Sequence, residues 1–295
     1  MMEIKIGFIG LGLMGSKCTE RLVGEGYTVY GYDRIAEKVA TAEKLGVIAC
    51  DSPAGVAQQA DQIHVCVMTS ADLEELLFGQ DGLASVEGAH KAIVDHSTTP
   101  VETTRSFADR LKEKNAMDWI DAPVSGGPPA ARDGTLAIMA GGRQSIVEGA
   151  MPVLKTLGDC TRMGDIGAGQ VTKMVNQILV LNNYCILAES LALAEAGGVD
   201  PEKIPTALAQ GHAGSNLLQS LFPRMIQRDY TPAGYAFQIL KDLHMVGDLA
   251  KKLEVPVPMS TQSKNLFQQL NDMGCAELDG SSVFKLFENG SAERA

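Results

Sequence analysis

Short apolar runs alternate with amphipathic segments along the first half of the chain. The runs are rich in β-branched and aromatic residues and have the length of strands; they cover 4–9, 28–32, 63–68, 92–95, 119–121, 136–140 and 160–163. Between them, segments such as 14–23, 37–44 and 101–112 carry apolar residues at helical spacing. Strands that alternate with helices predict a parallel sheet with right-handed crossovers.

The second half is predicted to be entirely helical from about Gly167 onward. Residues 170–196 contain no Gly or Pro and would form one helix of about 40 Å, at roughly 1.5 Å per residue. Further helices are expected at 201–210, 216–225, 236–253 and 259–273, and residues 289–295 are expected to fray. We therefore predict an α/β domain over residues 1–165 and an all-helical domain over residues 166–295.

Charge and cysteine content narrow the class of protein. The 295 residues carry a net charge of −11, which argues against a nucleic-acid partner because such proteins need a basic face. The N-terminal apolar run is too short for a signal sequence or a membrane span. The six cysteines show no C-x-x-C pair, so we expect no metal site and a reducing, cytoplasmic setting. Cys66, inside an apolar run, is expected to be a small buried side chain.

A glycine motif follows the first predicted strand and opens the first predicted helix. Residues 10–15 read Gly-Leu-Gly-Leu-Met-Gly and match the G-x-G-x-x-G pattern of a Rossmann dinucleotide-binding domain. In that pattern the backbone approaches the pyrophosphate, which sits on the helix N-terminus. The alternative, a purely structural glycine turn, is disfavoured by the strand–turn–helix context.

The end of the second predicted strand bears on the choice of cofactor. Asp33 lies roughly 20 residues after the glycine motif, where a carboxylate accepts hydrogen bonds from the adenosine ribose and repels a 2′-phosphate. The adjacent Arg34 is either a surface residue or a partner for such a phosphate. We predict NAD as the cofactor and leave NADP use open.

A second glycine turn is followed by a helix lysine. Residues 121–127 read Asp-Ala-Pro-Val-Ser-Gly-Gly, so successive N–H groups and the Ser125 hydroxyl could hold a carboxylate. Lys173, Asn176 and Gln177 share one face of the long predicted helix. Burial lowers the pKa of a lysine and suits it to acid–base catalysis. A plain turn and a solvent-facing lysine are the alternatives.

Together these segments resemble the β-hydroxyacid dehydrogenase family, which includes 3-hydroxyisobutyrate dehydrogenase and tartronate semialdehyde reductase. The resemblance covers the whole chain and rests on four ordered motifs, at residues 7–15, 121–127, 167–173 and 241–243. It implies an N-terminal Rossmann domain, a C-terminal all-helical domain and catalysis in the cleft between them. It also implies an oxidoreductase that moves hydride between NAD and a short hydroxy acid.

The resemblance assigns roles to individual residues. Lys173 would be the catalytic lysine, which gives a proton to the carbonyl oxygen during reduction and takes it back during oxidation. The carboxylate-bearing substrate would be held by Ser125, Gly126, Gly127, Asn176 and Gln177. The cofactor would be held by Gly10, Leu11, Gly12, Leu13, Met14, Gly15, Asp33, Arg34, Val67, Met68, Thr98 and Lys241.

Some details resemble the tartronate semialdehyde reductase (2-hydroxy-3-oxopropionate reductase) branch. They are the Asn176-Gln177 pair, the segment 211–218 and Asp33-Arg34. Two features depart from the family: Met68-Thr69 replaces its Leu-Pro, and His96 and His212 stand where apolar residues are usual. His64 and His96 have no metal or triad partner in sequence, and His64 is expected to pack in or beside its strand.

The leading substrate pair is therefore glycerate and tartronate semialdehyde. The enzyme alternative is another C3–C4 semialdehyde, such as that of 3-hydroxyisobutyrate, methylmalonate or succinate. A non-catalytic dinucleotide-binding scaffold is disfavoured by the retained Lys173. Phosphosugar decarboxylation is disfavoured because no basic cluster suits a substrate phosphate. The long apolar helix favours a homodimer or homotetramer.

Overall fold

The computed structural model describes residues 4–288, and the chain divides into two compact units, Met1–Lys173 and Met174–Ala295. The predicted fraying at 289–295 lies outside the described residues. The predicted domain boundary between residues 165 and 166 stays a prediction. The compact units divide slightly later, inside the long helix α8 (Ala168–Ala196).

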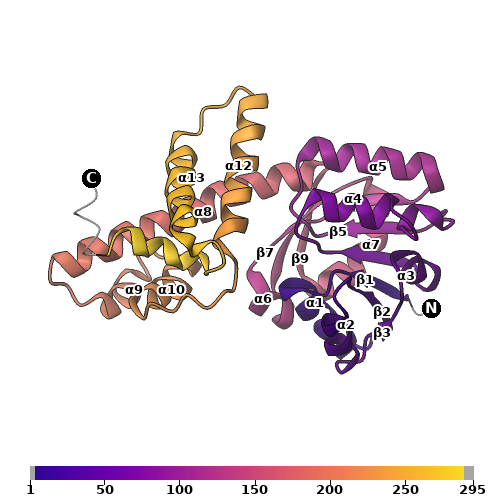
Figure 1. The fold of residues 1–295 in the computed structure, drawn as a ribbon, viewed down its shortest axis with the longest axis horizontal. Helices are drawn as coiled ribbons and strands as arrows, with labels where there is room; N and C mark the ends of the chain where they lie inside the picture. The colour runs from indigo at the N-terminus through magenta and orange to yellow at the C-terminus, as the bar shows by residue number, and fades with distance from the viewer. Residues whose placement is uncertain (1–3, 289–295) are drawn as a thin grey trace. The chain divides into compact units, whose positions relative to one another are not determined.

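A nine-stranded sheet forms the centre of the first unit (Figure 1). Its strands are β1 (Ile6–Ile9), β2 (Val29–Tyr32), β3 (Ile48–Ala49), β4 (Gln62–Val65), β5 (Ala92–Asp95), β6 (Asp118–Asp121), β7 (Val124–Ser125), β8 (Leu136–Gly141) and β9 (Gly158–Gly164). They lie in the order β3-β2-β1-β4-β5-β6-β8-β7, with β9 beside β8. The Rossmann fold predicted from the glycine motif is confirmed.

The predicted parallel sheet is confirmed for β1 to β6, and the strands predicted at 136–140 and 160–163 extend it as β8 and β9, but the direction of the chain changes at β8. β8 runs antiparallel to both β6 and β7, while β9 is parallel to β8. Parallel neighbours need a crossover of a dozen or more residues. The link from β7 to β8 holds only the seven-residue helix α6 (Gly127–Asp133), so the chain reverses direction there.

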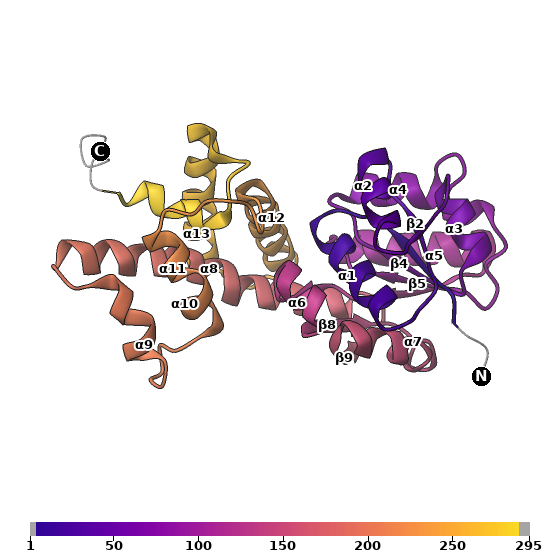
Figure 2. The same ribbon diagram turned by 90° about the horizontal axis from the view of Figure 1, so that it is seen from below.

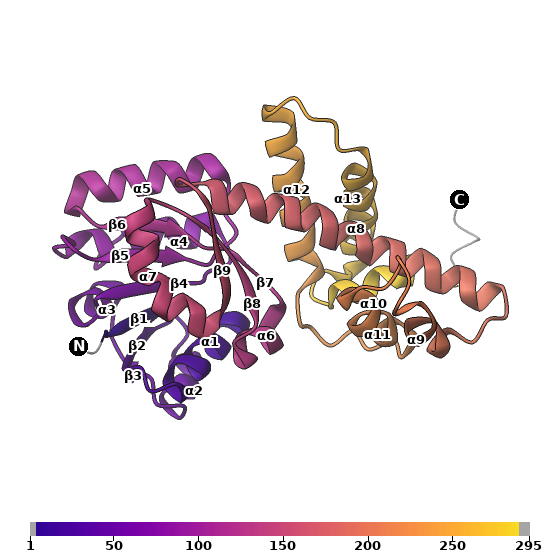
Figure 3. The ribbon, with the colours of Figure 1, turned by 180° about the vertical axis from the view of Figure 1, so that it is seen from behind.

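Helices cover both faces of the sheet, as expected where parallel strands are buried on both sides (Figures 1 and 3). They are α1 (Leu13–Gly24), α2 (Ala36–Glu43), α3 (Pro53–Gln59), α4 (Ser70–Phe78), the 3-10 turn Leu83–Ser85, α5 (Val101–Asn115), α6 and α7 (Gln144–Leu157). Neighbouring strand residues point to opposite faces. Val94 therefore joins a core with α1 and α7, and Ile93 joins one with α3, α4 and α5.

The second unit is helical, as predicted, and its core includes Leu181, Phe222, Leu243 and Phe267. After α8 come the 3-10 turn Pro201–Lys203, α9 (Ile204–Leu208), α10 (Asn216–Ser220), α11 (Phe222–Ile226), α12 (Ala236–Lys252), α13 (Pro258–Leu270), the π-turn Asn271–Cys275 and the 3-10 segment Gly280–Leu286. Figure 2 shows α10 and α11 beside α8, and Figure 3 shows α12 beside α13.

Two of the predicted helices in this unit are broken. The single helix expected at 216–225 is split into α10 and α11, because Pro223 has no N–H to continue the α10 hydrogen-bond ladder. The helix expected at 201–210 begins as a 3-10 turn, with Pro205 at the start of α9. Within the described residues of this unit there is one isolated bridge, Tyr235 to Asp279, and no strand.

Helix α8 is long and apolar enough to cross a membrane by length and composition alone. Several of its apolar side chains are instead buried in the protein core, among them Leu181, Cys185, Ala188 and Leu191. Burial of this kind identifies α8 as a core helix of the second unit.

Candidate active site

The glycine motif is held against the ends of β1 and β4. Gly10 has a φ of +92°, and a Cβ there would lie 2.2 Å from the Cys66 carbonyl oxygen. A Cβ at Gly15 would lie 1.8 Å from the Gly10 carbonyl oxygen, so both positions require glycine. Around Gly12, by contrast, a Cβ would meet only Lys38 Nζ, at 3.9 Å. The open backbone at Gly12 and the N-terminus of α1, which has no side-chain cap, fit a pyrophosphate.

Asp33 is fixed beside this motif by backbone groups. Its Oδ2 accepts a hydrogen bond from the Leu11 N–H at 2.8 Å, and its Oδ1 accepts one from the Ile35 N–H at 2.9 Å. The side chain is 8% exposed. Asp33 thus has the location and fixed orientation that a ribose-binding carboxylate needs.

Arg34 is engaged by a carboxylate of helix α4. Its Nη1 lies 2.7 Å from Asp72 Oδ1, while three quarters of the Arg34 side chain remains exposed. The Thr69 hydroxyl accepts from the Asp72 N–H and so caps α4. The Met68-Thr69 pair that departs from the family therefore supplies the start of α4, and α4 supplies the partner of Arg34.

The ends of β4 and β5 are tied together on the predicted cofactor path. The Val67 N–H donates to the Ser97 hydroxyl at 3.0 Å. Met68 is exposed and Thr98, which follows Ser97, is half-buried. The expectation that Cys66 is buried is wrong: it is half-buried, because β4 ends at Val65 and only part of the thiol side chain packs against the core.

Asp121, the last residue of β6, holds the start of α8. Its Oδ1 accepts from the Gly167 N–H at 2.8 Å, and its Oδ2 accepts from the Gln170 N–H at 2.9 Å. These N–H groups favour the ionised carboxylate. Burial has the opposite and larger effect and raises the pKa of Asp121 to about 7. In the sequence Asp121 stands out only as the first residue of the motif at 121–127, and its contact with the start of α8 was not predicted.

The structure brings the predicted lysine to the predicted turn. Lys173 Nζ donates a hydrogen bond to the Val124 carbonyl oxygen at 2.8 Å, and the residue is 8% exposed. Val124 directly precedes Ser125, which is half-buried on β7. Gly126 and Gly127 have φ values of +128° and +71°, which side chains rarely adopt. The lysine and the turn thus share one location in the first unit.

Gln170 connects this location to the β5 end. Its Nε2 donates to the Ser97 carbonyl oxygen at 2.8 Å, and its Oε1 accepts from the Thr99 N–H at 3.3 Å. The side chain is fully buried. The residues on either side of Thr98 are therefore held by the start of α8, the helix that also carries Lys173. The motif at residues 167–173 contains Gln170, but nothing in the sequence indicates the partners of its side chain.

The remaining predicted residues lie in the second unit. Asn176 Nδ2 donates to Gln177 Oε1 at 2.8 Å, and Gln177 Nε2 donates to the buried carboxylate of Asp242 on α12. Lys241 Nζ lies 3.3 Å from Asp242 Oδ1. The substrate and cofactor roles of these residues stay predictions. His212 is exposed between α9 and α10, and its role also stays open.

His64 and His96, which have no partner in sequence, contact each other in the fold. His64 Nδ1 lies 2.8 Å from His96 Nε2, and both rings are buried. Packing of His64 in its strand is as predicted. Among residues 4–288, no group of three or more His, Cys, Asp or Glu side chains is placed to hold a metal ion.

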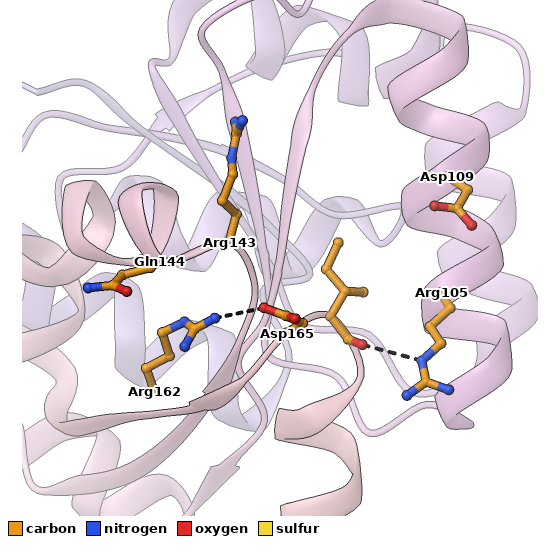
Figure 4. A pocket seen from close by; sticks show the side chains of 7 residues that line it. Arg105, Asp109, Arg143, Gln144, Arg162 and Asp165 are labelled. Atoms are coloured by element: carbon orange, nitrogen blue, oxygen red, sulfur yellow. Dashed lines mark hydrogen bonds and ion pairs between the residues drawn. The ribbon is translucent and has the colours of Figure 1, made fainter.

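A pocket of about 540 Å³ also opens on the first unit (Figure 4). Its arginines are engaged by neighbours: Arg105 Nε donates to the Ile166 carbonyl oxygen, and Arg162 pairs with Asp165. The pocket contains none of the predicted site residues; it is lined by Arg105, Asp109, Arg143, Gln144, Arg162, Asp165 and Ile166.

Two protein-family models match the chain. A family model described as the NAD binding domain of 6-phosphogluconate dehydrogenase matches residues 5–165. A second, described as NAD-binding of NADP-dependent 3-hydroxyisobutyrate dehydrogenase, matches residues 167–287. The two matches span both units and support NAD(P) as the cofactor.

Individual relatives are similar over nearly their whole length. A 2-hydroxy-3-oxopropionate reductase of Escherichia coli is 34% identical, covering 97% of this chain and 97% of the relative. A 2-(hydroxymethyl)glutarate dehydrogenase of Eubacterium barkeri is also 34% identical, over 97% and 95%. The crystal structure of a 3-hydroxyisobutyrate dehydrogenase from Salmonella typhimurium has a TM-score of 0.88 at 27% identity, covering 96% of this chain and 99% of that one. The chain therefore belongs to the 3-hydroxyisobutyrate dehydrogenase-like family, whose members are NAD(P)-dependent oxidoreductases acting on CH–OH groups.

Proposed function

We propose that this NAD(P)-dependent β-hydroxyacid dehydrogenase interconverts glycerate and tartronate semialdehyde, with NAD as the preferred cofactor. The observation that carries the proposal is the 2.8 Å contact between Lys173 and the Val124 carbonyl, immediately before the Ser-Gly-Gly turn. The contact supports the proposal because reduction of an aldehyde acid requires a proton donor close to groups that bind the carboxylate, the roles proposed for Lys173 and for this turn. The nicotinamide, when bound, supplies the hydride.

Different residues of the chain bind the substrate, transfer the proton and hold the cofactor in this proposal. Backbone N–H groups of Gly126 and Gly127, together with the Ser125 hydroxyl, bind the substrate carboxylate. Lys173 gives its proton to the substrate carbonyl oxygen as the alcohol forms and takes it back in the reverse direction. Asn176 and Gln177 orient the substrate. Gly10 to Gly15, Asp33, Val67, Met68, Thr98 and Lys241 hold the cofactor.

A three-carbon substrate is favoured by two features beyond the shared family motifs. The Asn176-Gln177 pair that follows the lysine resembles the tartronate semialdehyde reductase branch. Hydrogen bonds from Asn176 to Gln177 and from Gln177 to Asp242 hold these polar side chains in place. A relative named 2-hydroxy-3-oxopropionate reductase is 34% identical. A site built with polar groups favours a hydroxyl-bearing acid over a methyl-bearing one.

A substrate panel tests the proposal. The kcat/KM values for NADH-dependent reduction are compared for the semialdehydes of tartronate, methylmalonate and succinate, and again with NADPH. We expect tartronate semialdehyde to exceed the others by at least about 10- to 200-fold, the range of one methylene in a hydrophobic pocket, because a site that binds a substrate hydroxyl discriminates more strongly. A higher kcat/KM for another semialdehyde would make that compound the preferred substrate. Absence of turnover with all of them would favour the non-catalytic scaffold.

We also propose that the protein is a cytoplasmic homodimer or homotetramer without a nucleic-acid or membrane partner. Leu179, Ile186 and Leu193 of α8 are 64%, 44% and 76% exposed and recur at seven-residue intervals. Such a spacing puts them on one helix face. An apolar stripe of this kind is typical of surfaces covered by another subunit, and a second copy of this chain is the proposed cover.

A further inference from the structure

Two buried histidines lie side by side in the parallel sheet. His64 belongs to β4 and His96 directly follows β5; they are 0% and 4% exposed. The two rings lie edge to edge with their planes inclined by 29°, and both stack on Phe8 of β1. Two adjacent buried imidazoles are unusual in a sheet core and require hydrogen-bond partners for all four ring nitrogens or a solvent path.

The partners determine which ring nitrogen carries the proton. His96 Nδ1 lies 2.8 Å from the Ala122 carbonyl oxygen, which can only accept, so Nδ1 carries the hydrogen and Nε2 accepts. His64 Nδ1 must then donate to His96 Nε2, at 2.8 Å. His64 Nε2 in turn accepts from the Gln62 side-chain amide, at 2.7 Å. Gln62, His64 and His96 form a row of donors directed toward Ala122, which we name the histidine row.

The Ala122 carbonyl needs this donor because the strand ladder stops there. The Ala122 N–H donates to the Asp95 carbonyl oxygen, so a continued parallel ladder would bring the Ser97 N–H to the Ala122 carbonyl. The Ser97 N–H is instead taken by the Asp95 carboxylate at 2.9 Å. His96 Nδ1 replaces it and satisfies a buried acceptor that would otherwise be costly.

The backbone that follows Ala122 carries the candidate chemistry. The Pro123 carbonyl accepts from the Met139 N–H of β8, and the Val124 carbonyl accepts from Lys173 Nζ. The Ser-Gly-Gly turn comes next. The orientation of the Ala122 peptide thus sets where the acceptor of Lys173 and the turn can lie.

We propose that the histidine row is a positioning device, in which Gln62, His64 and His96 hold the Ala122 peptide and through it the Val124 carbonyl and the Ser125–Gly127 turn. None of the three side chains touches substrate in this role. This positioning role adds to the proposed function, and it depends on that function only in the tests that measure activity.

The row needs both rings neutral. A proton on either ring would put two N–H groups face to face between the histidines or against Gln62. Burial lowers the pKa of His96 to about 4 and that of His64 well below its usual value. The core on this face contributes the titratable groups Cys18, Tyr27, Cys66 and Cys160. Asp95 and Asp121 point to the opposite face by strand alternation.

Imidazole ¹⁵N NMR of the purified protein tests the row without any assay of activity. We expect both His64 and His96 to be neutral with the proton on Nδ1, and neither to titrate between pH 5 and 8. A proton on Nε2 of either ring, or a titration near the ordinary histidine value of about 6.5, would overturn the row.

Three variants test the positioning role. His96→Leu removes the donor, and His96→Asn keeps a nitrogen near the Nδ1 position. Val94→Ala removes buried volume beside the row, on the same face of β5, but takes away none of its hydrogen-bonding groups. We expect His96→Leu to lower kcat for the preferred semialdehyde by about 10- to 100-fold, with NADH Kd within about threefold of wild type. His96→Asn should recover most of kcat, and Val94→Ala should retain it despite a lower Tm.

The outcomes distinguish the positioning role of the histidine row from the proposed function of the enzyme. Equal kcat for His96→Leu and Val94→Ala would overturn the positioning role, even if NMR supports the row. If His96→Leu does not fold, a His96→Asn kcat as low as one tenth of that of Val94→Ala would overturn it. A wild-type enzyme that reduces no semialdehyde would contradict the proposed function, and the NMR result would still decide whether the row exists.

Discussion

Lys173, near the start of α8, donates a hydrogen bond to the carbonyl oxygen of Val124 on β7 at 2.8 Å. The two residues are far apart in sequence and are brought together because Asp121, just before Val124, holds the N–H groups of Gly167 and Gln170. One carboxylate therefore fixes the distance between a helix that carries the lysine and a turn that can bind a carboxylate.

Stability of the protein should depend on the protonation of Asp121. Its folded-state pKa of about 7 lies above the usual unfolded value of about 3.9, so the folded state binds this proton more tightly. Its contribution is fully present below the unfolded pKa and is lost as pH rises through 7. We expect the free energy of unfolding of wild type, relative to Asp121→Asn, to fall by about 2 kcal/mol between pH 5 and 7.

Chemical denaturation of both proteins at pH 5, 6, 7 and 8 measures this difference. A control variant, Asp118→Asn, removes a half-buried β6 carboxylate that pairs with Lys112 and Arg143 at the surface. A difference between wild type and Asp121→Asn that is flat across this range would mean that Asp121 stays ionised at α8.

Gln170 should act through the backbone that it holds. Gln170→Met keeps similar volume but leaves the Ser97 carbonyl and the Thr99 N–H without this partner in a buried location. We expect a loss of about 2 kcal/mol in the free energy of unfolding, the cost of one or two unpaired buried polar groups. NADH affinity should also fall, because Thr98 lies between the two released groups. Fluorescence titration with NADH measures that affinity. An unchanged Kd would separate Gln170 from the cofactor site.

Cofactor choice should respond to the ion pair between Arg34 and Asp72. Asp72→Asn frees the Arg34 guanidinium to meet a 2′-phosphate, so KM for NADPH should fall about fivefold while KM for NADH stays constant. Glu74→Gln is the matched control, because Glu74 is on the same helix and pairs with Arg110 instead. An equal effect of the two variants would point to a general change in charge rather than to Arg34.

The apolar stripe on α8 predicts how the oligomer can be broken. Leu193→Glu puts a charge where the proposed partner copy packs, so light scattering after size exclusion should show a smaller assembly. Leu253→Glu is the control, since Leu253 is 56% exposed but lies beyond the end of α12 rather than on α8. A wild-type monomer, or an unchanged mass for Leu193→Glu, would contradict this use of the stripe.

Local sequence patterns predicted much of the fold and less of the site. The glycine motif and the alternation of runs identified β1, β2, β4 to β6 and the Rossmann unit, because period and turn chemistry are local properties. The antiparallel β8 depends on how few residues join β7 to it, which periodicity does not report. Lys173 and the Ser-Gly-Gly turn were found as motifs, whereas the supports given by Asp121 and Gln170 depend on tertiary contacts.

The pairing of His64 with His96 is a further feature that could not be predicted from the sequence. In sequence His64 lies in one apolar run and His96 directly follows another, and each is more typical of a packed core side chain than of a pair. Only the parallel register of β4 and β5, which sets His64 opposite Val94, brings the two rings together. Their tautomers follow from partners that no sequence pattern reveals.

The assignment of Lys173 as the proton donor is tested most directly by measuring reduction of the preferred semialdehyde by three variants. They are Lys173→Ala, Lys173→Arg and the neighbouring control Thr172→Ala. With the lysine removed, kcat should fall by about 10²- to 10⁴-fold, and Lys173→Arg should be equally slow because a guanidinium keeps its proton at neutral pH. NADH Kd should stay within about threefold, and Thr172→Ala should remain active. Turnover of Lys173→Ala close to wild type would contradict the assignment of Lys173 as the proton donor.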